Sequence, residues 1–446
     1  MSANVERDPK PRSILDMNAF DPARQEAAPE LLQRRRRNSG PLSVLFYRRP
    51  IEMIEARGAW MTAADGRRYL DMYNNVPSVG HGHPRVVEAA MRQMERLNTN
   101  TRYLHDTVER YRERLLQTFD GNLDKLILCC SGSEANDLAL QMAARATGAR
   151  GVVVTETAYH GNTTAVRAIS PASLKCGDLP AHVRIVPAPD RRAYGHNITG
   201  GMALAIRAAA DDLKRSGYGF SAFVADAVFS SDGVFTEPER FLLAVQREVH
   251  RAGGLYIADE VQCGFGRTGT RLWGYQRHLV KPDIVTLGKP MGNGYPMSGL
   301  VTRYDLMAGV AEDTGYFNTF GGNTVAAATG LAVLEVLEAE QLGLNAAEVG
   351  AGLKRQIEAL AQADRRIRAV RGCGLYLGIE LVDDNGAPAP ELCIEAIEAL
   401  RRHGILIGAA GRYGNVLKVR PPLCLQPEEA ALLPEALASA LESIPV

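Results

Sequence analysis

Residues 283–299 read DIVTLGKPMGNGYPMSG, and this stretch decides both the fold and the candidate site. The apolar run Ile284–Leu287 is typical of a strand buried on both faces, and it leads directly to Lys289 between two turn-forming residues. Lysine forms Schiff bases with carbonyl compounds once its amine is neutral, which burial favours. A lysine in a Gly- and Pro-rich stretch is otherwise a solvated turn residue, so the catalytic interpretation depends on the rest of the chain.

The composition describes a large protein without a marked charge. The chain has 446 residues, 46% of them hydrophobic, and its 51 basic and 51 acidic residues give a net charge of 0. A chain longer than about 250–300 residues usually divides into two domains. Balanced charge gives no electrostatic reason to expect a nucleic acid or an anionic membrane as partner. No apolar run reaches the ~18 residues of a membrane span, and no signal-peptide pattern opens the chain.

Seven cysteines are scattered along the chain without a CxxC pair. An odd, scattered set without metal-ligand spacing is typical of a reduced intracellular protein. We therefore expect a cytoplasmic location and no metal site.

Short apolar runs alternate with segments of helical length through residues 81–323. These runs are Leu126–Cys130, Gly151–Thr155, Ala222–Ala225, Leu255–Ala258 and Ile284–Leu287. The alternation predicts a large α/β domain, doubly wound around a mostly parallel sheet. Residues 324–446 are richer in helices, with short strands at Leu375–Leu381 and Ile405–Ile407, and predict a smaller α+β domain.

Two segments precede the large domain. Residues 46–80 alternate like short strands joined at Asp65-Gly66, and we expect them to join the small domain. Residues 1–45 form an N-terminal extension with the run Arg34–Arg37. Arginine runs bind phosphates in some proteins, but on this balanced chain a solvated helix end or a mobile tail is the simpler interpretation.

Ligands of open parallel sheets lie outside the carboxyl ends of the strands, so the residues just after each strand are site candidates. The first run is followed by Ser131, Gly132 and Ser133, which open a helix. The N–H groups and positive dipole end of a helix N-terminus favour a phosphate there. The same serines equally fit a plain N-cap, with Glu134 in the first turn.

Two further strand ends carry ligand-like residues. Tyr159 and His160 follow the second run; an aromatic ring there stacks on a planar ligand, although a Tyr-His pair in a loop is otherwise unremarkable. Asp259 ends another run, where a buried acid pairs with a cation or serves as a structural cap or ion pair. With Lys289, these ends supply the lysine, carboxylate, phosphate anchor and ring contact that pyridoxal phosphate needs.

Five longer motifs carry a resemblance to a known family. CSGSEANDLAL, AYHGNT, IADEVQCGFGRTG, PDIVTLGKPMGNGYP and FNTFGGN resemble the class III aminotransferases of fold type I, over roughly residues 60–422. The resemblance implies that Lys289 forms the internal aldimine and moves the substrate proton, and that Asp259 pairs with the pyridinium nitrogen.

The same resemblance implies further cofactor contacts. Val261 and Tyr159 would pack on the two ring faces, and Gln262 would bond the ring hydroxyl. Thr319 would complete the phosphate site of a neighbouring subunit, which implies a homodimer with shared sites. The full set of implied cofactor residues is Ser131, Gly132, Ser133, Tyr159, His160, Asp259, Val261, Gln262, Lys289 and Thr319.

Two departures from the family pattern concern the substrate. Many members carry a glutamate in the segment after the strand that precedes Asp259, where residues 226–233 of this chain read DAVFSSDG; Ser231 in this segment is a candidate substrate residue. Many also bind the substrate's α-carboxylate through an arginine before a Pro-Pro pair, where this chain has Lys418, followed by Arg420. Lysine lacks the bidentate fork of arginine. These features resemble the branch of alanine–glyoxylate aminotransferase 2-like proteins and the ethanolamine-phosphate and phosphohydroxylysine phospho-lyases.

The motif YNNVPSVGHGH adds Asn74, Asn75, Ser78 and His81 as residues that the resemblance places toward the substrate; a polar turn before a helix is the alternative. We expect a pyridoxal-phosphate-dependent aminotransferase that moves an amino group from an amine or amino acid to a keto acid through a quinonoid carbanion. The alternative is a phospho-lyase that eliminates phosphate and ammonia from a phosphorylated amino alcohol. A further alternative is a ligand-binding or scaffold protein without catalytic activity, and the presence of both Lys289 and Asp259 argues against it. A nucleotide-binding enzyme is not indicated, because no GxGxxG or Walker-type loop follows a strand.

Overall fold

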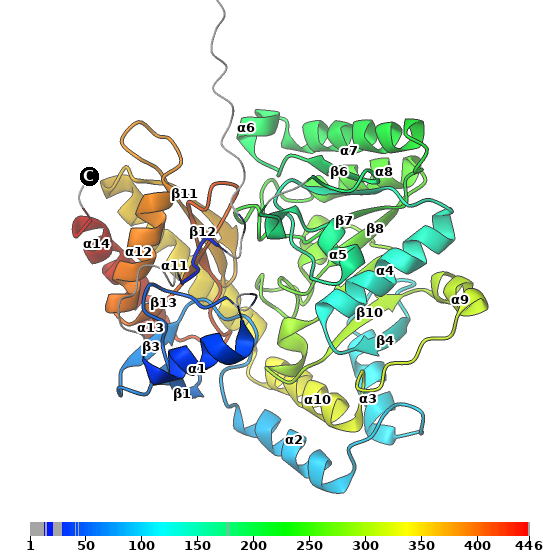
Figure 1. Ribbon diagram of the computed structural model, residues 1–446, viewed down its shortest axis with the longest axis horizontal. Coiled ribbons are helices and arrows are strands. Elements are labelled where there is room, and N and C mark those ends of the chain that lie inside the picture. The colour runs from blue at the N-terminus through cyan, green and yellow to red at the C-terminus, as the bar shows by residue number, and fades with distance from the viewer. Residues whose placement is uncertain are drawn as a thin grey trace, which may run out of the picture.

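The computed structural model places a large region on a seven-stranded sheet beside a smaller region with two four-stranded sheets (Figure 1). The structure describes residues 13, 16–20, 29–40, 42, 44–175 and 178–444. A large part of the predicted extension, residues 1–45, therefore lies outside the described residues. Within it, helix α1 (Glu30–Ser39) contains the run Arg34–Arg37.

The large sheet has the order β4-β10-β9-β8-β7-β5-β6, and only β10 runs antiparallel to its neighbours. Its strands are β4 (Lys125–Cys129), β5 (Val152–Thr155), β6 (Val183–Val186), β7 (Ala222–Ala225), β8 (Leu255–Asp259), β9 (Ile284–Leu287) and β10 (Ser298–Thr302). The predicted mostly parallel sheet is confirmed, and all five predicted apolar runs are strands in it. Their carboxyl ends therefore meet at one edge.

Two strands of this sheet have no clear signal in the sequence. β6 lies at the sheet edge with Ile185 47% exposed, so its pattern is not uniformly apolar. β10 begins Ser-Gly and continues the glycine-rich stretch after Lys289, although all of its residues are buried. Small residues weaken the strand pattern there, because the packing that selects them comes from neighbouring strands.

Helices cover both faces of the sheet, as alternate strand residues require. Val154, Val224 and Ile257 share one core cluster with α4 (Gly132–Thr147), α5 (Thr164–Ala168) and α9 (Tyr304–Asp313). Their neighbours Val153, Phe223 and Tyr256 point to the opposite face and share the main core with α7 (Ile198–Arg215) and α8 (Phe241–Arg251). This two-sided burial is the doubly wound arrangement that the apolar runs predicted.

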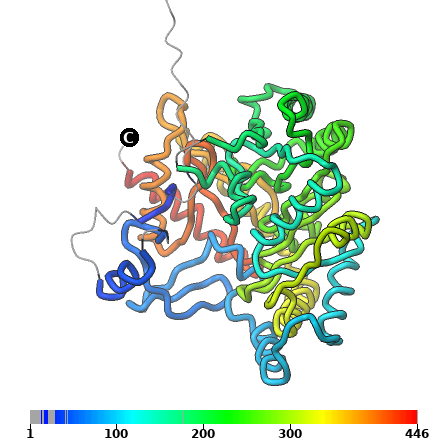
Figure 2. Tube along the Cα trace, turned by 45° about the vertical axis from the view of Figure 1, so that its right-hand side comes forward, coloured from blue at the N-terminus to red at the C-terminus, as the bar shows by residue number. Residues whose placement is uncertain are grey.

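The smaller region combines the two ends of the chain, and Figure 2 shows the N-terminal strands in blue beside the orange and red C-terminal segments. One sheet has the order β1-β2-β3-β13, in which β13 runs parallel to β3; the other has the order β11-β12-β15-β14. The strands are β1 (Met53–Arg57), β2 (Trp60–Ala63), β3 (Arg68–Asp71), β11 (Ile367–Cys373), β12 (Tyr376–Leu381), β13 (Ile405–Leu406), β14 (Gly408–Ala410) and β15 (Val416–Val419).

The remaining helices connect and cover these sheets. They are α2 (Pro84–Arg96), α3 (Asp106–Leu116), α6 (Arg191–Tyr194), α10 (Thr324–Ala339), α11 (Leu342–Ala363), α12 (Pro390–Arg402), α13 (Pro427–Ala430) and α14 (Leu432–Glu442), with single 3-10 turns at Pro171–Ser173, Gly274–His278 and Lys289–Gly292. Helix α10 packs against α2 and α3 and leads into the small region. Among the described residues, no helix combines the length and apolarity required to cross a membrane.

Two glycines of α11 give a matched test of this packing. An added Cβ at Gly350 would overlap the carbonyl oxygen of Gly374, whereas one at Gly352 would meet nothing within 4 Å. We expect Gly350→Ala to lower the free energy of unfolding by about 1–3 kcal/mol, because a rigid backbone has to move. Gly352→Ala should raise it by about 0.5–1 kcal/mol through helix propensity. Urea unfolding of both variants measures the difference, and equal effects would contradict this packing.

Candidate active site

The carboxyl ends of the parallel strands enclose a small cavity of about 130 Å³. It is lined by Gly132, Ser133, Tyr159, His160, Gly161, Asp226, Asp259, Val261, Gln262 and Lys289. Hollows of about 460 and 500 Å³ lie elsewhere and share none of these lining residues, so size alone does not mark the site. Seven of the predicted cofactor residues come together around the cavity, besides its lysine.

Lys289 follows β9 directly and begins a 3-10 turn, where its φ of 22° lies in the region that favours glycine. Burial of the amine lowers the pKa of Lys289 to about 8, and the positive charge of Arg420 adds to the effect. The negative charges of Asp259 and Asp226 act in the opposite direction. The lysine is therefore available as a neutral amine at a pH near its working range.

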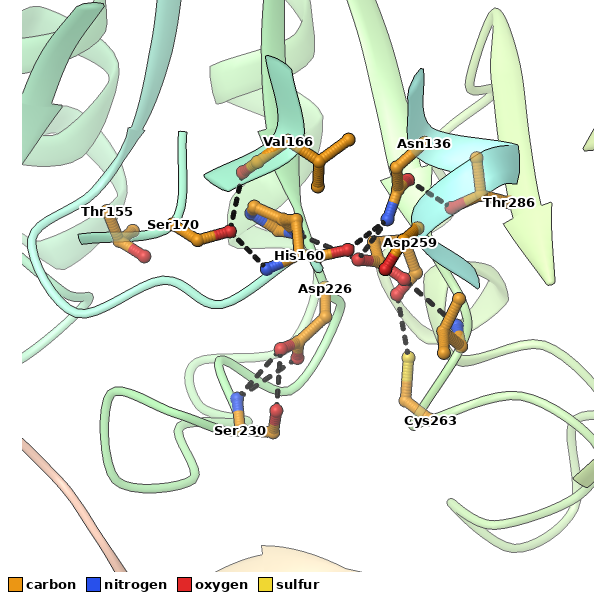
Figure 3. A network of polar contacts seen from close by, with 12 residues as sticks. Asn136, Thr155, His160, Val166, Ser170, Asp226, Ser230, Asp259, Cys263 and Thr286 are labelled. Atoms are coloured by element: carbon orange, nitrogen blue, oxygen red, sulfur yellow. Dashed lines mark hydrogen bonds and ion pairs between the residues drawn. The ribbon is translucent and has the colours of Figure 1, made fainter. Parts of the chain in front are cut away.

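Asp259 ends β8 and is held by three donors (Figure 3). Its Oδ2 accepts from His160 Nδ1 at 2.7 Å and from Asn136 Nδ2 at 3.0 Å. Its Oδ1 accepts from the backbone N–H of Val261 at 3.1 Å. The carboxylate is only 5% exposed, yet its buried oxygens are hydrogen-bonded, as a buried charge requires.

The three residues of the predicted phosphate turn, Ser131–Ser133, have two different positions in the structure. Ser131 is the N-cap of α4, where its side chain accepts from the N–H of Glu134 at 3.3 Å, and it does not line the cavity. Gly132 and Ser133 do line it. Ser133 Oγ accepts from the N–H of Asn162 at 3.1 Å, and a Cβ at Gly161 would overlap that hydroxyl. Only glycine allows the two loops to approach so closely.

Gln262 links the cavity to the small region. Its Oε1 accepts from Tyr376 Oη at 3.2 Å on β12 and also from Arg420 Nη1 just after β15. Because the side-chain oxygen is occupied by these two donors, the amide nitrogen remains to face the cavity. The preceding residue, Val261, packs against the backbone of Gly132. A Cβ at Gly132 would be 3.0 Å from the Val261 side chain.

The predicted substrate residues between β3 and α2 divide into two pairs. Asn75 donates to the carbonyl of Gln262 at 3.3 Å, and Ser78 donates to the carbonyl of Pro290 at 3.4 Å. Both side chains therefore contact the backbone of the loops that carry Gln262 and Lys289. Asn74 and His81 instead bond to Asp71, at 3.2 and 2.8 Å. The polar-turn alternative describes this second pair.

Ser231, Lys418 and Arg420 are all buried, with exposed fractions of 3%, 1% and 8%. Burial and the charge of Arg420 lower the pKa of Lys418, on which Asp226 also acts. Ser231 Oγ and Arg420 Nε have no hydrogen-bond partner among the described residues. The guanidinium of Arg420 lies over the ring of Tyr73 at 4.4 Å. Lys418 and Arg420 thus lie near Lys289, and burial favours the neutral form of Lys418.

Thr319 lies outside the cavity of its own chain and is exposed. Its loop is fastened nearby, because Asn318 Nδ2 donates to Glu134 Oε2 at 3.0 Å and Tyr316 Oη bonds to Cys129 Sγ at 3.2 Å. Large apolar side chains around the loop are exposed, among them Phe320 at 69%.

Three residues of the site were missed by the sequence interpretation. Asp226 lines the cavity, and burial raises its pKa although it accepts from the N–H groups of Val228 and Ser230. It follows β7 as Asp259 ends β8, so the same rule about strand ends could have found it. Gly161 and Asn136 lie inside quoted motifs, but their contacts cross more than twenty residues and leave no local signal.

Residues 47–441 match the family model described as aminotransferase class-III. The chain belongs to this family. It is 37% identical to alanine–glyoxylate aminotransferase 2 homolog 2, mitochondrial, of Arabidopsis thaliana, over 92% of this chain and 87% of that one. It is 36% identical to ethanolamine-phosphate phospho-lyase homolog 1 of Caenorhabditis elegans, over 89% of each.

Among solved structures, a phospholyase from Arthrobacter in complex with phosphoethanolamine superposes with a TM-score of 0.90 and 43% identity, covering 93% of this chain and 100% of that one. The predicted family and fold type are therefore confirmed. The chain is an enzyme of a pyridoxal-phosphate-dependent family whose members include both transaminases and phospho-lyases.

The lowered pKa of Lys289 predicts how its amine reacts with pH. Trace acetylation of the apoprotein, with mass spectrometry of the Lys289 peptide, should show labelling that rises through pH 8 as the ammonium loses its proton. Arg420→Gln removes a positive charge that disfavours the ammonium, so the midpoint should move to higher pH. Arg420→Lys keeps the charge and should keep the midpoint. A wild-type midpoint near the ordinary lysine value of about 10.4 would contradict the buried amine.

Proposed function

We propose that the cavity holds pyridoxal phosphate, and the residues present fit that group. Lys289, whose pKa is lowered, and Asp259, whose carboxylate is hydrogen-bonded, meet the N-terminus of α4 at this cavity. The three come from separate strand ends. Gly132 and Gly161 keep the walls open where any side chain would collide with Val261 or Ser133. When bound, the cofactor supplies an electron sink for a carbanion at the substrate's Cα.

The chain's own residues have separate roles in this proposal. Lys289 anchors the cofactor aldehyde and then takes the Cα proton on its Nζ. Asp259 holds a proton on the ring nitrogen, Gln262 offers its amide to the ring hydroxyl, and Val261 and Tyr159 enclose the ring. Gly132 and Ser133 hold the phosphate with the first N–H groups of α4.

We further propose that the enzyme is a phospho-lyase acting on a phosphorylated amino alcohol such as ethanolamine phosphate. The observation that carries this proposal is the pair Lys418 and Arg420, both buried beside Lys289. In the segment where many family members carry a glutamate, residues 226–233 of this chain contain none, and Ser231 Oγ there has no hydrogen-bond partner among the described residues. Asp226 and Asp232 already act on Lys418, and a phosphate dianion would add negative charge that favours the charged form of Lys418.

In the proposed reaction, Lys289 removes the proton from Cα, and the bond between Cβ and the ester oxygen breaks. The bonding electrons leave with phosphate, the enamine that remains takes up a proton at Cβ to become an imine, and water then replaces ammonia to give an aldehyde. The similarity to the Arthrobacter phospholyase, whose complex contains phosphoethanolamine, supports this choice. Transamination between an amine or amino acid and a keto acid is the second candidate, favoured by the alanine–glyoxylate aminotransferase relatives.

We propose that the enzyme works as a homodimer in which Thr319 completes the phosphate site of the partner subunit. Thr319 is exposed in the single chain, and its neighbours include exposed apolar side chains that a second copy would cover. These are Tyr103, Leu104, Tyr316, Phe317 and Phe320. A cytoplasmic location is part of the same proposal, supported by the six described cysteines, which are free thiols.

Ethanolamine phosphate offered without any keto acid distinguishes the two reactions. We expect the holoenzyme to release inorganic phosphate, ammonia and acetaldehyde in equal amounts, because elimination needs no amino-group acceptor. Lys289→Ala should release none, although the cofactor can still bind. Accumulation of pyridoxamine phosphate without free phosphate would instead establish transamination.

Lys418 gives a second test of the phosphate site. Lys418→Met keeps the length of a buried side chain and removes its charge, so folding should survive. A hydrogen bond to a charged group contributes about 1.5–3 kcal/mol, and kcat/KM for ethanolamine phosphate should fall about tenfold to a hundredfold. Lys418→Arg should retain more activity than Lys418→Met. Unchanged kcat/KM in Lys418→Met, measured by phosphate release, would remove Lys418 from the substrate site.

A further inference from the structure

Asn136 lies in the first turns of α4 and points from the helix toward the end of β8 (Figure 3). The residue is 1% exposed, and each of its polar atoms has a partner. Its Nδ2 donates to the carbonyl of His160 at 2.8 Å and to Asp259 Oδ2 at 3.0 Å. Its Oδ1 accepts from Thr286 Oγ1 at 2.7 Å.

Two acceptors beside Nδ2 decide which way the Asn136 amide faces, and the hydroxyl of Thr286 donates to the amide oxygen. If the amide turned over, its oxygen would lie against two acceptors, the His160 carbonyl and the Asp259 carboxylate, and both contacts would be repulsive. Thr286 sits on β9 directly opposite Asp259 in the parallel register. The strand that leads to Lys289 therefore also holds the oxygen of the amide that bonds to Asp259.

The backbone of His160 is fixed at both of its polar atoms. Its N–H donates to Ser170 Oγ at 2.9 Å, while its carbonyl accepts from Asn136. Ser170 in turn donates to the carbonyl of Val166 at 2.7 Å. These two bonds fix the peptide groups on either side of His160, and the imidazole bonds to Asp259 Oδ2 from this fixed main chain. They also fix the main chain next to Tyr159.

These contacts leave Asp259 with one direction in which it can accept a further bond. Oδ2 is occupied by His160 and Asn136, and Oδ1 has one of its two acceptor positions occupied by the N–H of Val261. The remaining acceptor position of Oδ1 is the one available to the cavity that Asp259 lines.

We propose that Asn136 and Thr286 are positioning residues, which aim the Asp259 carboxylate at the ring nitrogen of the bound cofactor. This inference rests on the proposed cofactor, but it does not depend on whether the reaction is elimination or transamination. Loss of either residue should weaken the bond between Asp259 and the ring nitrogen specifically, because neither residue lines the cavity.

Binding to the apoprotein tests this role without any turnover. Pyridoxal phosphate is compared with 1-deazapyridoxal phosphate, in which a C–H group replaces the ring nitrogen and every other contact is kept. Thr286→Val, which keeps the side-chain shape and removes the hydroxyl, should raise the Kd for pyridoxal phosphate about tenfold, as removal of an outer partner of a ligand-binding group typically does. Its Kd for the analogue should stay unchanged, and Thr286→Ser should restore wild-type affinity for both.

Asn136→Leu provides a second variant, in which both donors of the amide are lost, and a larger change confined to pyridoxal phosphate is expected. Thermal melting of each apoprotein confirms that the variants are folded. Equal weakening for pyridoxal phosphate and the analogue would show a merely structural role and overturn the inference. Failure of the wild-type protein to bind either compound would instead overturn the proposed function.

Discussion

The parallel register that sets Asp259 of β8 opposite Thr286 of β9 is the constraint on which the whole site depends. Side chains alternate along a strand, so a slip of one residue would turn Asp259 to the other face of the sheet. Lys289 stands three residues beyond Thr286, and the same slip would change its distance from the acid. The apolar faces of both strands prevent the slip, because burying a different set of residues would expose the core.

The second constraint is the cost of removing charges from water. Asp259 and Lys418 are buried and Asp226 is half-buried, and an isolated charge removed from water is expensive. Each acid accepts from both backbone and side-chain donors. Asp226 accepts from Val228 and Ser230, and Asp259 accepts from Val261, Asn136 and His160. Burial is the main reason that the pKa of Lys289 is lowered; the charge of Arg420 adds to this effect, and the charges of Asp259 and Asp226 oppose it.

The sequence predicted what local patterns can encode. Strands buried on both faces appear as apolar runs, and residues at their carboxyl ends follow from the topology, so Lys289 and Asp259 were identified. Asn136 was not, because its bond to Asp259 joins residues 123 positions apart and an asparagine in a helix carries no signal of its partner. From the sequence, Ser131 and Ser133 were equally good candidates for the helix cap and for the phosphate site. The geometry of the turn makes Ser131 the N-cap of α4 and places Ser133 in the cavity wall.

The two regions of the molecule divide the chemistry between them. Residues proposed to handle the cofactor, Lys289 and Asp259 among them, stand on the large sheet, whereas Lys418 and Arg420 belong to the end of β15 in the small region. The two sets meet at Gln262, which bonds to Arg420 through the oxygen of its amide. Substitutions on β15 can therefore change the group that is recognised without disturbing proton removal at Cα.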